Sequence, residues 1–107
     1  MDLLVIDSHD GEKAFPLFKK GTPVSDLIVG TDTEYPHWFP CMIDGNKTFI
    51  PDIYVTDGIL VQDFNPTELA IEKGEVVTVL NLVYGWIYVR TEDGCKGWLP
   101  ASKVISI

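Results

Sequence analysis

The sequence predicts an all-β protein built from two consecutive small β-barrels that pack closely together. Three observations lead to this prediction. The chain has 107 residues, a length that suits one ordinary domain or two very small ones. It has almost no sustained apolar spacing of the kind that marks an amphipathic helix. Several short blocks of sequence also occur twice along the chain, in the same order.

Short runs rich in Val, Ile, Tyr, Phe and Trp alternate with Gly, Pro, Asn and Asp, which is typical of strands joined by turns. Segments of this length and spacing favour a barrel or a sandwich. We predict strands at Leu3–Asp7, Val24–Val29, Trp38–Ile43, Lys47–Ile50, Ile59–Phe64, Val76–Leu80, Trp86–Arg90 and Lys96–Leu99.

Two hairpins are the clearest local features. Asp44-Gly45 separates two of the predicted strands, and Asp93-Gly94 separates another two. Asp-Gly readily adopts the positive φ values that short β-turns need. Both pairs therefore predict tight turns between antiparallel strands.

The repeated blocks indicate two copies of one unit. A period of roughly fifty residues gives too few copies for a solenoid. Leu4–Asp7 recurs as Leu60–Asp63, Phe18–Gly21 as Ile71–Gly74, Trp38 as Trp86, and Phe49–Val55 as Trp98–Val104.

The predicted domains are residues 1–56 and residues 57–107. Their spacer is only Thr56-Asp57-Gly58, because strand-like residues lie on both sides of it. So short a join restricts relative motion, and we expect the two units to touch.

The second half resembles the SH3 domain. Leu60–Phe64 is similar to the family's ALYDY block, and Glu68–Glu75 is similar to ELSF-x-KGD. Gly85–Ile87 is similar to GWW, and Gly97–Val104 to G-x-x-P-x-x-YV. The first half resembles a more divergent copy, mainly through Lys20-Gly21, Trp38 and Phe49–Val55.

This resemblance implies a surface that binds extended, proline-rich peptides, because flat aromatic rings complement proline rings. Four matching positions fall in each copy. They are Phe64, Trp86, Trp98 and Pro100 in the second copy, and Trp38, Phe49, Pro51 and Tyr54 in the first.

Neither copy matches every aromatic position of the family. In the second copy, Gln62 and Lys103 stand where the family has tyrosines. In the first copy, Ile6 and Ser8 replace the aromatic residues of ALYDY. We therefore expect two partial surfaces that complement each other.

Strand alternation predicts which side chains face the core. After Gly85, we expect Ile87 and Val89 to point inward and Trp86 to point outward. By the same alternation Phe39 and Cys41 point inward, and Cys41 is expected to be a small buried apolar residue without a redox role.

The charge balance limits the class of partner. Eight Lys and Arg face sixteen Asp and Glu, giving a net charge of −8. This excess repels phosphate groups, so we expect no nucleic acid and no anionic membrane as partner. Basic peptides or basic protein surfaces fit better, although acidity can equally serve only solubility.

We expect no catalysis, cofactor or metal. Ser8, His9 and Asp10 are consecutive, and consecutive side chains diverge too far to form a catalytic relay. Cys41 and Cys95 lie far apart and have no zinc-site spacing with the histidines. The sequence also has no glycine-rich phosphate loop.

These observations favour a non-enzymatic adaptor or scaffold that binds a protein segment, as a monomer or weak homodimer. One alternative is a small acidic inhibitor or immunity-type protein that blocks a basic site on its partner. A further alternative is a cell-wall-binding SH3-like module. We see no export signal or membrane span and expect a reduced, cytoplasmic protein.

Overall fold

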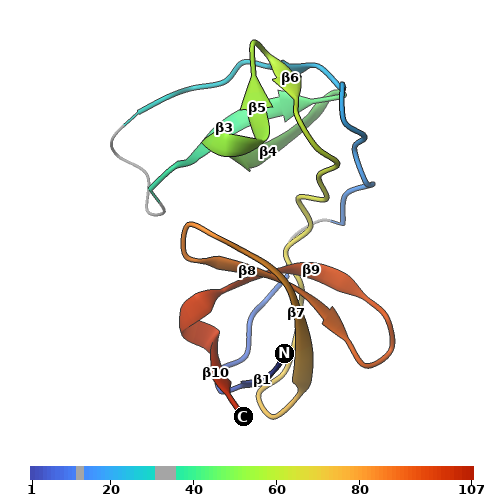
Figure 1. Cartoon of the computed structure of the whole chain (residues 1–107), viewed down its shortest axis with the longest axis vertical. Coiled ribbons are helices and arrows are strands. Elements are labelled where there is room, and N and C mark those ends of the chain that lie inside the picture. Colours follow the sequence, from blue (N-terminus) through green and yellow to red (C-terminus); the bar gives the residue numbers. More distant parts are fainter. Residues whose placement is uncertain (12–13, 31–35) are drawn as a thin grey trace. The chain divides into compact units, whose positions relative to one another are not determined.

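The computed structural model describes residues 1–11, 14–30 and 36–107 and confirms the all-β fold class (Figure 1). Within these ranges, no helix is long and apolar enough to cross a membrane. The elements are β1 Asp2–Val5, β2 Val24–Ser25, β3 Trp38–Ile43, β4 Asn46–Pro51, the 3-10 turn η1 Asp52–Tyr54, β5 Val55–Thr56, β6 Ile59–Leu60, β7 Val76–Val83, β8 Trp86–Thr91, β9 Lys96–Pro100, the 3-10 turn η2 Ala101–Lys103 and β10 Val104–Ser106.

The chain folds into two compact units, and these do not coincide with the predicted halves 1–56 and 57–107. Unit 1 consists of Met1–Phe15 together with Thr67–Ile107, whereas unit 2 is the continuous segment Pro16–Pro66. The units are therefore not consecutive along the chain. Unit 2 is inserted between the first strand of unit 1 and the rest of that unit.

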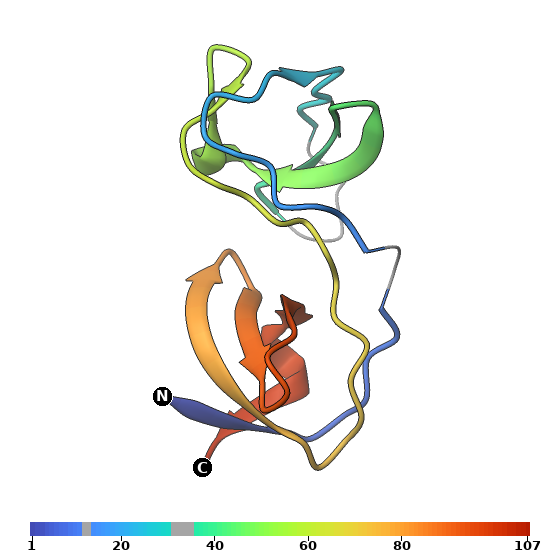
Figure 2. The same cartoon turned by 90° about the vertical axis from the view of Figure 1, so that its right-hand side faces the viewer.

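Unit 1 contains a five-stranded antiparallel sheet in the order β10-β1-β7-β8-β9. The N-terminal strand β1 lies beside the C-terminal strand β10, as both views show (Figures 1 and 2). Apolar side chains from all parts of the unit form its core. These are Leu3, Val5, Leu69, Ile71, Val77, Ile87, Val89, Leu99 and Val104.

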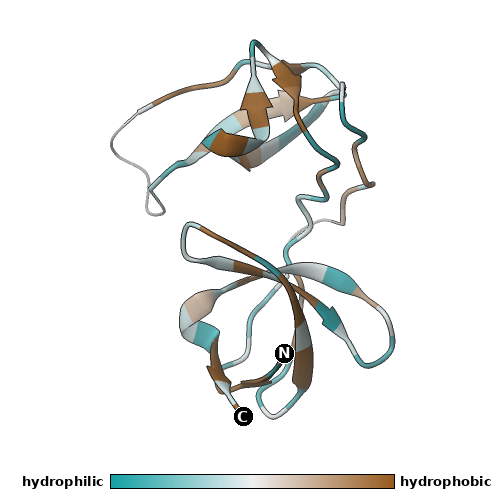
Figure 3. Cartoon of the chain, in the orientation of Figure 1, coloured by the Kyte–Doolittle hydropathy of each residue, from teal (hydrophilic) through white to brown (hydrophobic). Residues whose placement is uncertain are grey.

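Unit 2 contains a three-stranded sheet in the order β2-β3-β4 and a two-stranded sheet of β5 and β6. Isolated bridges connect Phe18 with Phe64 and Pro23 with Ile59. The short strand β6 is hydrophobic in both residues (Figure 3). The most deeply buried side chains of unit 2 are those of Ile43, Ile50, Pro51, Leu60 and Phe64.

Both units use the same backbone hydrogen bonds to hold their first strand. In unit 1, Val5 donates to Glu75 at 2.9 Å and accepts from Gly74 at 2.8 Å. In unit 2, Leu60 donates to Thr22 at 2.9 Å and accepts from Gly21 at 2.8 Å. Val5 and Leu60 are therefore equivalent positions, one residue away from the match of Leu4 with Leu60 that the sequence suggested.

The first strands of the two predicted copies thus pair outside their own halves of the chain, an arrangement here called the exchange of first strands. The segment Leu60–Phe64, which begins the second copy in the sequence, completes unit 2. The strand β1, which begins the first copy, completes unit 1.

The Asp57-Gly58 pair gives the local reason for this exchange. Both residues have positive φ, 53° and 73°, as in a two-residue hairpin turn. The turn pairs Val55 with Leu60 and Thr56 with Ile59. The chain therefore folds back on the strand that it has just left.

Both predicted Asp-Gly hairpins are confirmed. Asp44-Gly45 joins β3 to β4 with φ values of 49° and 78°. The loop at Asp93-Gly94 joins β8 to β9, with the Gly94 amide donating to the Thr91 carbonyl at 3.0 Å. A further tight turn, Tyr84-Gly85, joins β7 to β8.

The predicted strands are found at their predicted positions, but the lengths of some differ from the prediction. The strand at Trp38–Ile43 has its predicted bounds. Val24–Val29 shortens to Val24–Ser25, because Asp26 adopts a positive φ of 52° that breaks the strand. Val76–Leu80 extends to Val83 through an irregularity between Val79 and Asn81.

The inward side chains are those that alternation predicted. Phe39 and Cys41 are buried in unit 2, and Ile87 and Val89 are buried in unit 1. Trp86 is buried as well, at 8% exposure. It was predicted to point outward and to be exposed, but it is covered, and the His9 ring meets its indole edge to face at 6.0 Å.

Candidate protein-binding surfaces

Unit 2 gathers four side chains that match peptide-binding positions of the SH3 pattern, here called the unit 2 aromatic cluster: Trp38, Pro51, Tyr54 and Phe64. Trp38 begins β3 and pairs in register with Pro51 at the end of β4. The Phe64 ring lies 6.4 Å from Trp38 and 5.5 Å from Tyr54, the latter edge to face. Such ring geometries add to the stability of the contact beyond the buried area.

Phe64 reaches this cluster through the exchanged strand. Its amide donates to the Phe18 carbonyl at 2.8 Å and its carbonyl accepts from the Phe18 amide at 2.8 Å. The Lys20 amide also donates to Asp63 at 2.8 Å. These bonds fix the segment before Phe64 within unit 2.

The cluster is buried, and its neighbour Phe49 is not. Trp38 is 7% exposed and Tyr54 4%, whereas Phe49 is 52% exposed. Phe49 pairs in register with Pro40, two residues along from the Trp38 and Pro51 pair. Because side chains two residues apart share a face of a strand, Phe49 and Pro40 continue the surface that the cluster begins.

A polar pair closes one end of the cluster. His37 Nδ1 lies 2.8 Å from Asp52 Oδ2, and the Asp52 amide donates to the His37 carbonyl at 2.9 Å. These bonds hold the start of β3 against η1. They hold a carboxylate that is 38% exposed at the start of η1, directly after Pro51.

Unit 1 keeps Trp86 and Pro100 at the positions of Trp38 and Pro51, but it has His9 and Lys103 where unit 2 has Phe64 and Tyr54. These two residues and the carboxylates that they contact are here called the unit 1 polar site: Asp7, His9, Glu68 and Lys103. His9 exchanges two backbone hydrogen bonds of 3.0 Å with Ile71, as Phe64 does with Phe18. An imidazole therefore occupies in unit 1 the place that a phenyl ring occupies in unit 2.

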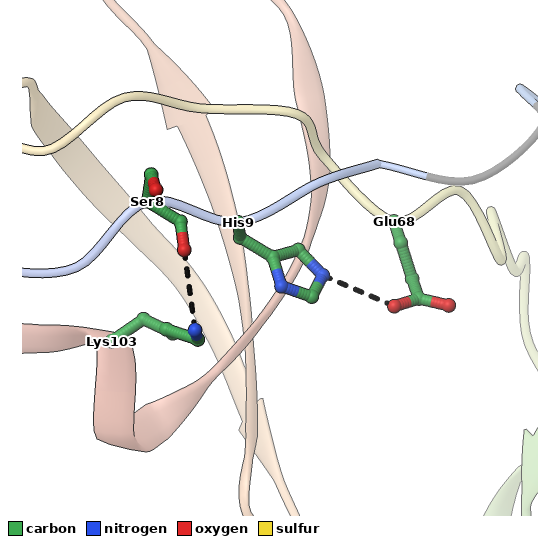
Figure 4. Close-up of polar contacts among 4 residues, drawn as sticks. All are labelled: Ser8, His9, Glu68 and Lys103. Carbon is green, nitrogen blue, oxygen red and sulfur yellow. Dashed lines mark hydrogen bonds and ion pairs between the residues drawn. The ribbon is translucent and has the colours of Figure 1, made fainter.

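The side chains of the unit 1 polar site bind one another. His9 Nε2 lies 3.1 Å from Glu68 Oε1, and Lys103 Nζ lies 3.2 Å from Asp7 Oδ2 (the His9 and Glu68 pair is drawn in Figure 4). Lys103 also donates to the Ser8 carbonyl at 3.2 Å. The His9 ring meets Trp86 edge to face at 6.0 Å.

Trp98 and Pro100 support this site from β9. Pro100 is buried and pairs in register with Trp86. Trp98 is 3% exposed and packs on Tyr88 at 5.0 Å. Its amide donates to Thr67 at 2.8 Å and its carbonyl accepts from Leu69 at 3.1 Å, which anchors the segment that carries Glu68.

The structure therefore groups the predicted site residues differently from the sequence. Trp38, Phe49, Pro51 and Tyr54 lie in unit 2, as their order predicted, and Phe64 joins them there. Trp86, Trp98 and Pro100 lie in unit 1 without Phe64. Sequence reasoning missed Asp7, His9 and Glu68, and the signal that could have found them is the hairpin turn at Asp57-Gly58.

The consecutive Ser8, His9 and Asp10 do not form a relay. The His9 imidazole is directed to Glu68, and the Ser8 carbonyl accepts from Lys103. In the described ranges, no group of three or more His, Cys, Asp or Glu is arranged to hold a metal ion. Burial raises the pKa of the Cys41 thiol to about 11, which keeps it a neutral apolar group at physiological pH.

The fold places this chain among small all-β proteins, and its C-terminal part defines it further. Residues 58–107 match the family model of the variant SH3 domain. The chain therefore contains an SH3-type domain, and domains of this type serve as protein-interaction modules. No curated protein and no solved structure matches the chain. The matched range begins in the segment that completes unit 2 and continues through unit 1.

Proposed function

We propose that the protein is a non-enzymatic binding module that recognises a proline-containing, basic peptide or protein segment through unit 2. The observation that carries this proposal is the contact of Phe64 with Trp38 and Tyr54. It brings the aromatic positions of the family pattern together in one unit, beside Pro51.

The shape of the surface supports an extended ligand. Pro40 and the exposed ring of Phe49 continue the face on which Trp38 and Pro51 lie. A ligand in the polyproline conformation presents flat proline rings at regular intervals and loses little entropy when it docks on such a row. The buried rings of the cluster form a rigid floor at one end of this row.

The charge supports a basic ligand. The chain carries a net charge of −8, and Asp52 lies at the end of the cluster beside His37. Opposite charge raises association rates and suppresses wrong partners. We therefore propose that an Arg or Lys of the ligand approaches the Asp52 end of the surface.

A peptide titration tests the proposal. A short proline-rich peptide that carries one Arg is added to the full chain, and amide NMR shifts are followed. We expect a dissociation constant in the micromolar range, as is usual for small interfaces. The shifts should centre on β3, β4 and η1. Phe49→Ala should weaken binding roughly fivefold or more, because a contacting aromatic ring is lost.

A matched control separates this effect from general damage. Leu82 in β7 is another exposed apolar residue, at 63%, and it belongs to unit 1. Leu82→Ala should leave the affinity unchanged. The proposal fails if broad proline-rich libraries do not bind, or if Phe49→Ala and Leu82→Ala have equal effects.

Two results would replace the proposal by another function. Tight stoichiometric capture of one folded basic partner, with a strongly salt-dependent on-rate, would indicate an inhibitor or immunity-type protein. Sedimentation of the chain with peptidoglycan would indicate a cell-wall-binding module. Either result, with no peptide binding, contradicts the adaptor role.

A further inference from the structure

We infer that the exchange of first strands sets the binding specificity of each unit, and that the Asp57-Gly58 turn enforces the exchange. The specificity part of this inference rests on the proposed function. The arrangement of the strands can be tested without any ligand.

The backbone by itself does not distinguish the two ways of pairing. Val5 and Leu60 make equivalent pairs of hydrogen bonds, and the Ile6 amide donates to Lys103 as the Val61 amide donates to Tyr54, at 2.8 Å and 3.0 Å. A chain in which each copy kept its own first strand would form the same types of backbone bond. The preference for one pairing over the other must therefore come from the side chains and from the turn that connects the strands.

The side chains favour the observed pairing. Asp7 meets the ammonium group of Lys103 in unit 1, and Phe64 meets the ring of Tyr54 in unit 2. In the unexchanged pairing, Phe64 would lie beside Lys103, and the Asp7 segment would lie beside Tyr54. The observed arrangement pairs opposite charges in unit 1 and aromatic rings in unit 2.

The turn favours the observed pairing as well. Only Asp57 and Gly58 separate β5 from β6, and both are in the left-handed conformation. The three Cα steps from Thr56 to Ile59 span at most about 11 Å when fully extended, which restricts β6 to places close to the end of β5. Closing this short loop also costs less chain entropy than pairing with a distant segment.

The exchange gives the units unlike surfaces. Unit 2 receives Phe64 and is lined by aromatic rings, whereas unit 1 receives Asp7 and His9 and is lined by charged and polar groups. Unit 2 therefore selects a proline-containing segment. Unit 1 keeps Trp86 and Trp98 but has His9 and Lys103 in place of two rings, so it selects against such a segment.

Fluorine NMR on the full chain tests the arrangement. The three tryptophans are labelled as 5-fluorotryptophan, and their signals are assigned with single Trp→Phe variants. We expect Phe64→Leu to move the Trp38 signal and His9→Leu to move the Trp86 signal, because these are the ring neighbours. The crossed result, Phe64→Leu moving Trp86 and His9→Leu moving Trp38, would overturn the exchange.

A second measurement covers the case in which Phe64→Leu does not fold. In the wild-type chain, nuclear Overhauser contacts should link the Trp38 indole with the Phe64 ring. Contacts of Phe64 with Trp86 instead would overturn the inference.

Lengthening the turn tests its role. A flexible Gly-Ser insert between Asp57 and Gly58 frees β6 from its local hairpin. We expect a second set of Trp38 and Trp86 signals from chains with unexchanged strands, and a matching loss of peptide binding at unit 2. Unchanged signals and unchanged binding would show that the turn does not enforce the exchange. If the ring contacts hold but no peptide binds the wild type, the proposed function fails while the exchange stands.

Discussion

At the scale of single residues, the two cysteines show how position alters one chemical group. Cys41 lies on the inner face of β3 with 5% of its surface exposed, whereas Cys95 is exposed in the turn before β9. Water stabilises a thiolate, and a buried site withholds that stabilisation. Burial accordingly raises the pKa of Cys41 to about 11 from the ordinary value of 9.0.

The two thiols should therefore react differently. With an aromatic disulfide reagent near neutral pH, we expect one thiol per native chain to react quickly, and Cys95→Ser should abolish this fast phase. In denaturant both thiols of the wild type should react. Fast reaction of two thiols in the native chain would contradict the burial of Cys41.

The same shift makes stability depend on pH. The folded pKa lies above the unfolded one, so the stabilisation is complete below pH 9 and is lost as pH rises toward about 11. In urea unfolding, the Cys41 thiol should lower the free energy of unfolding by roughly 2 kcal/mol across this window. Cys41→Ala should remove that part of the fall, and an equal fall in both chains would contradict the assignment.

Gly11 shows the opposite kind of constraint, in which no side chain fits. A Cβ atom at Gly11 would lie 2.7 Å from the Ala70 amide nitrogen and 2.8 Å from the Glu68 carbonyl oxygen. We expect Gly11→Ala to destabilise unit 1 by about 1–3 kcal/mol in urea unfolding, because backbone must move. Gly30→Ala is the control, since a Cβ there meets no atom of the described residues within 4 Å. Equal stability of the two variants would show that the segment of Gly11 does not pack in unit 1.

At the scale of elements, the hairpin of β5 and β6 is the decisive structure. Each of its strands has two residues, too few to be stable in isolation. It persists because Leu60 is buried in unit 2 and is bonded to Gly21 and Thr22. The turn directs β6 back along β5, and the burial of Leu60 in the core of unit 2 stabilises the hairpin.

Backbone conformation at this turn should therefore be measurable as stability. Gly58 has a φ of 73°, and an added Cβ would have no atom of the described residues closer than 3.7 Å, so the penalty comes from backbone conformation. We expect Gly58→Ala to cost about 1–2 kcal/mol in urea unfolding. Asp57→Asn should cost little, because Asn tolerates the left-handed region. A cost for Asp57→Asn as large as that for Gly58→Ala would argue against the two-residue turn.

At the scale of the whole molecule, the insertion of unit 2 into unit 1 decides which fragments can fold. Pro16–Pro66 is continuous and contains every strand of unit 2. A fragment of residues 57–107 covers the whole family match but lacks β1. Without β1, the strands β7 and β10 lose their shared neighbour.

We therefore expect the isolated fragment 16–66 to show dispersed amide NMR signals, with the modest stability of a very small domain. The fragment 67–107 should be unfolded alone and should fold when a peptide of residues 1–15 is added. Cooperative folding of 57–107 by itself would contradict the connectivity, because that fragment would then use Ile59–Phe64 as its own first strand.

The sequence by itself determined most of the local structure. Asp44-Gly45 and Asp93-Gly94 were predicted as hairpins, and alternation placed Phe39, Cys41 and Val89 in the core. These features depend on neighbours along the chain, and neighbours are visible in a sequence. The SH3 resemblance of the second half is likewise confirmed by the family match at residues 58–107.

Only the tertiary structure decided which first strand completes which unit. Leu3–Val5 and Leu60 carry similar apolar side chains, so their pattern does not choose a partner. Residues distant in sequence make that choice, through the Asp7–Lys103 pair and the packing of Phe64 on Tyr54. The Asp57-Gly58 turn was present in the sequence but was interpreted as a spacer between domains. In the folded chain it is a hairpin, because the segment after it gains a buried place in unit 2 by turning back.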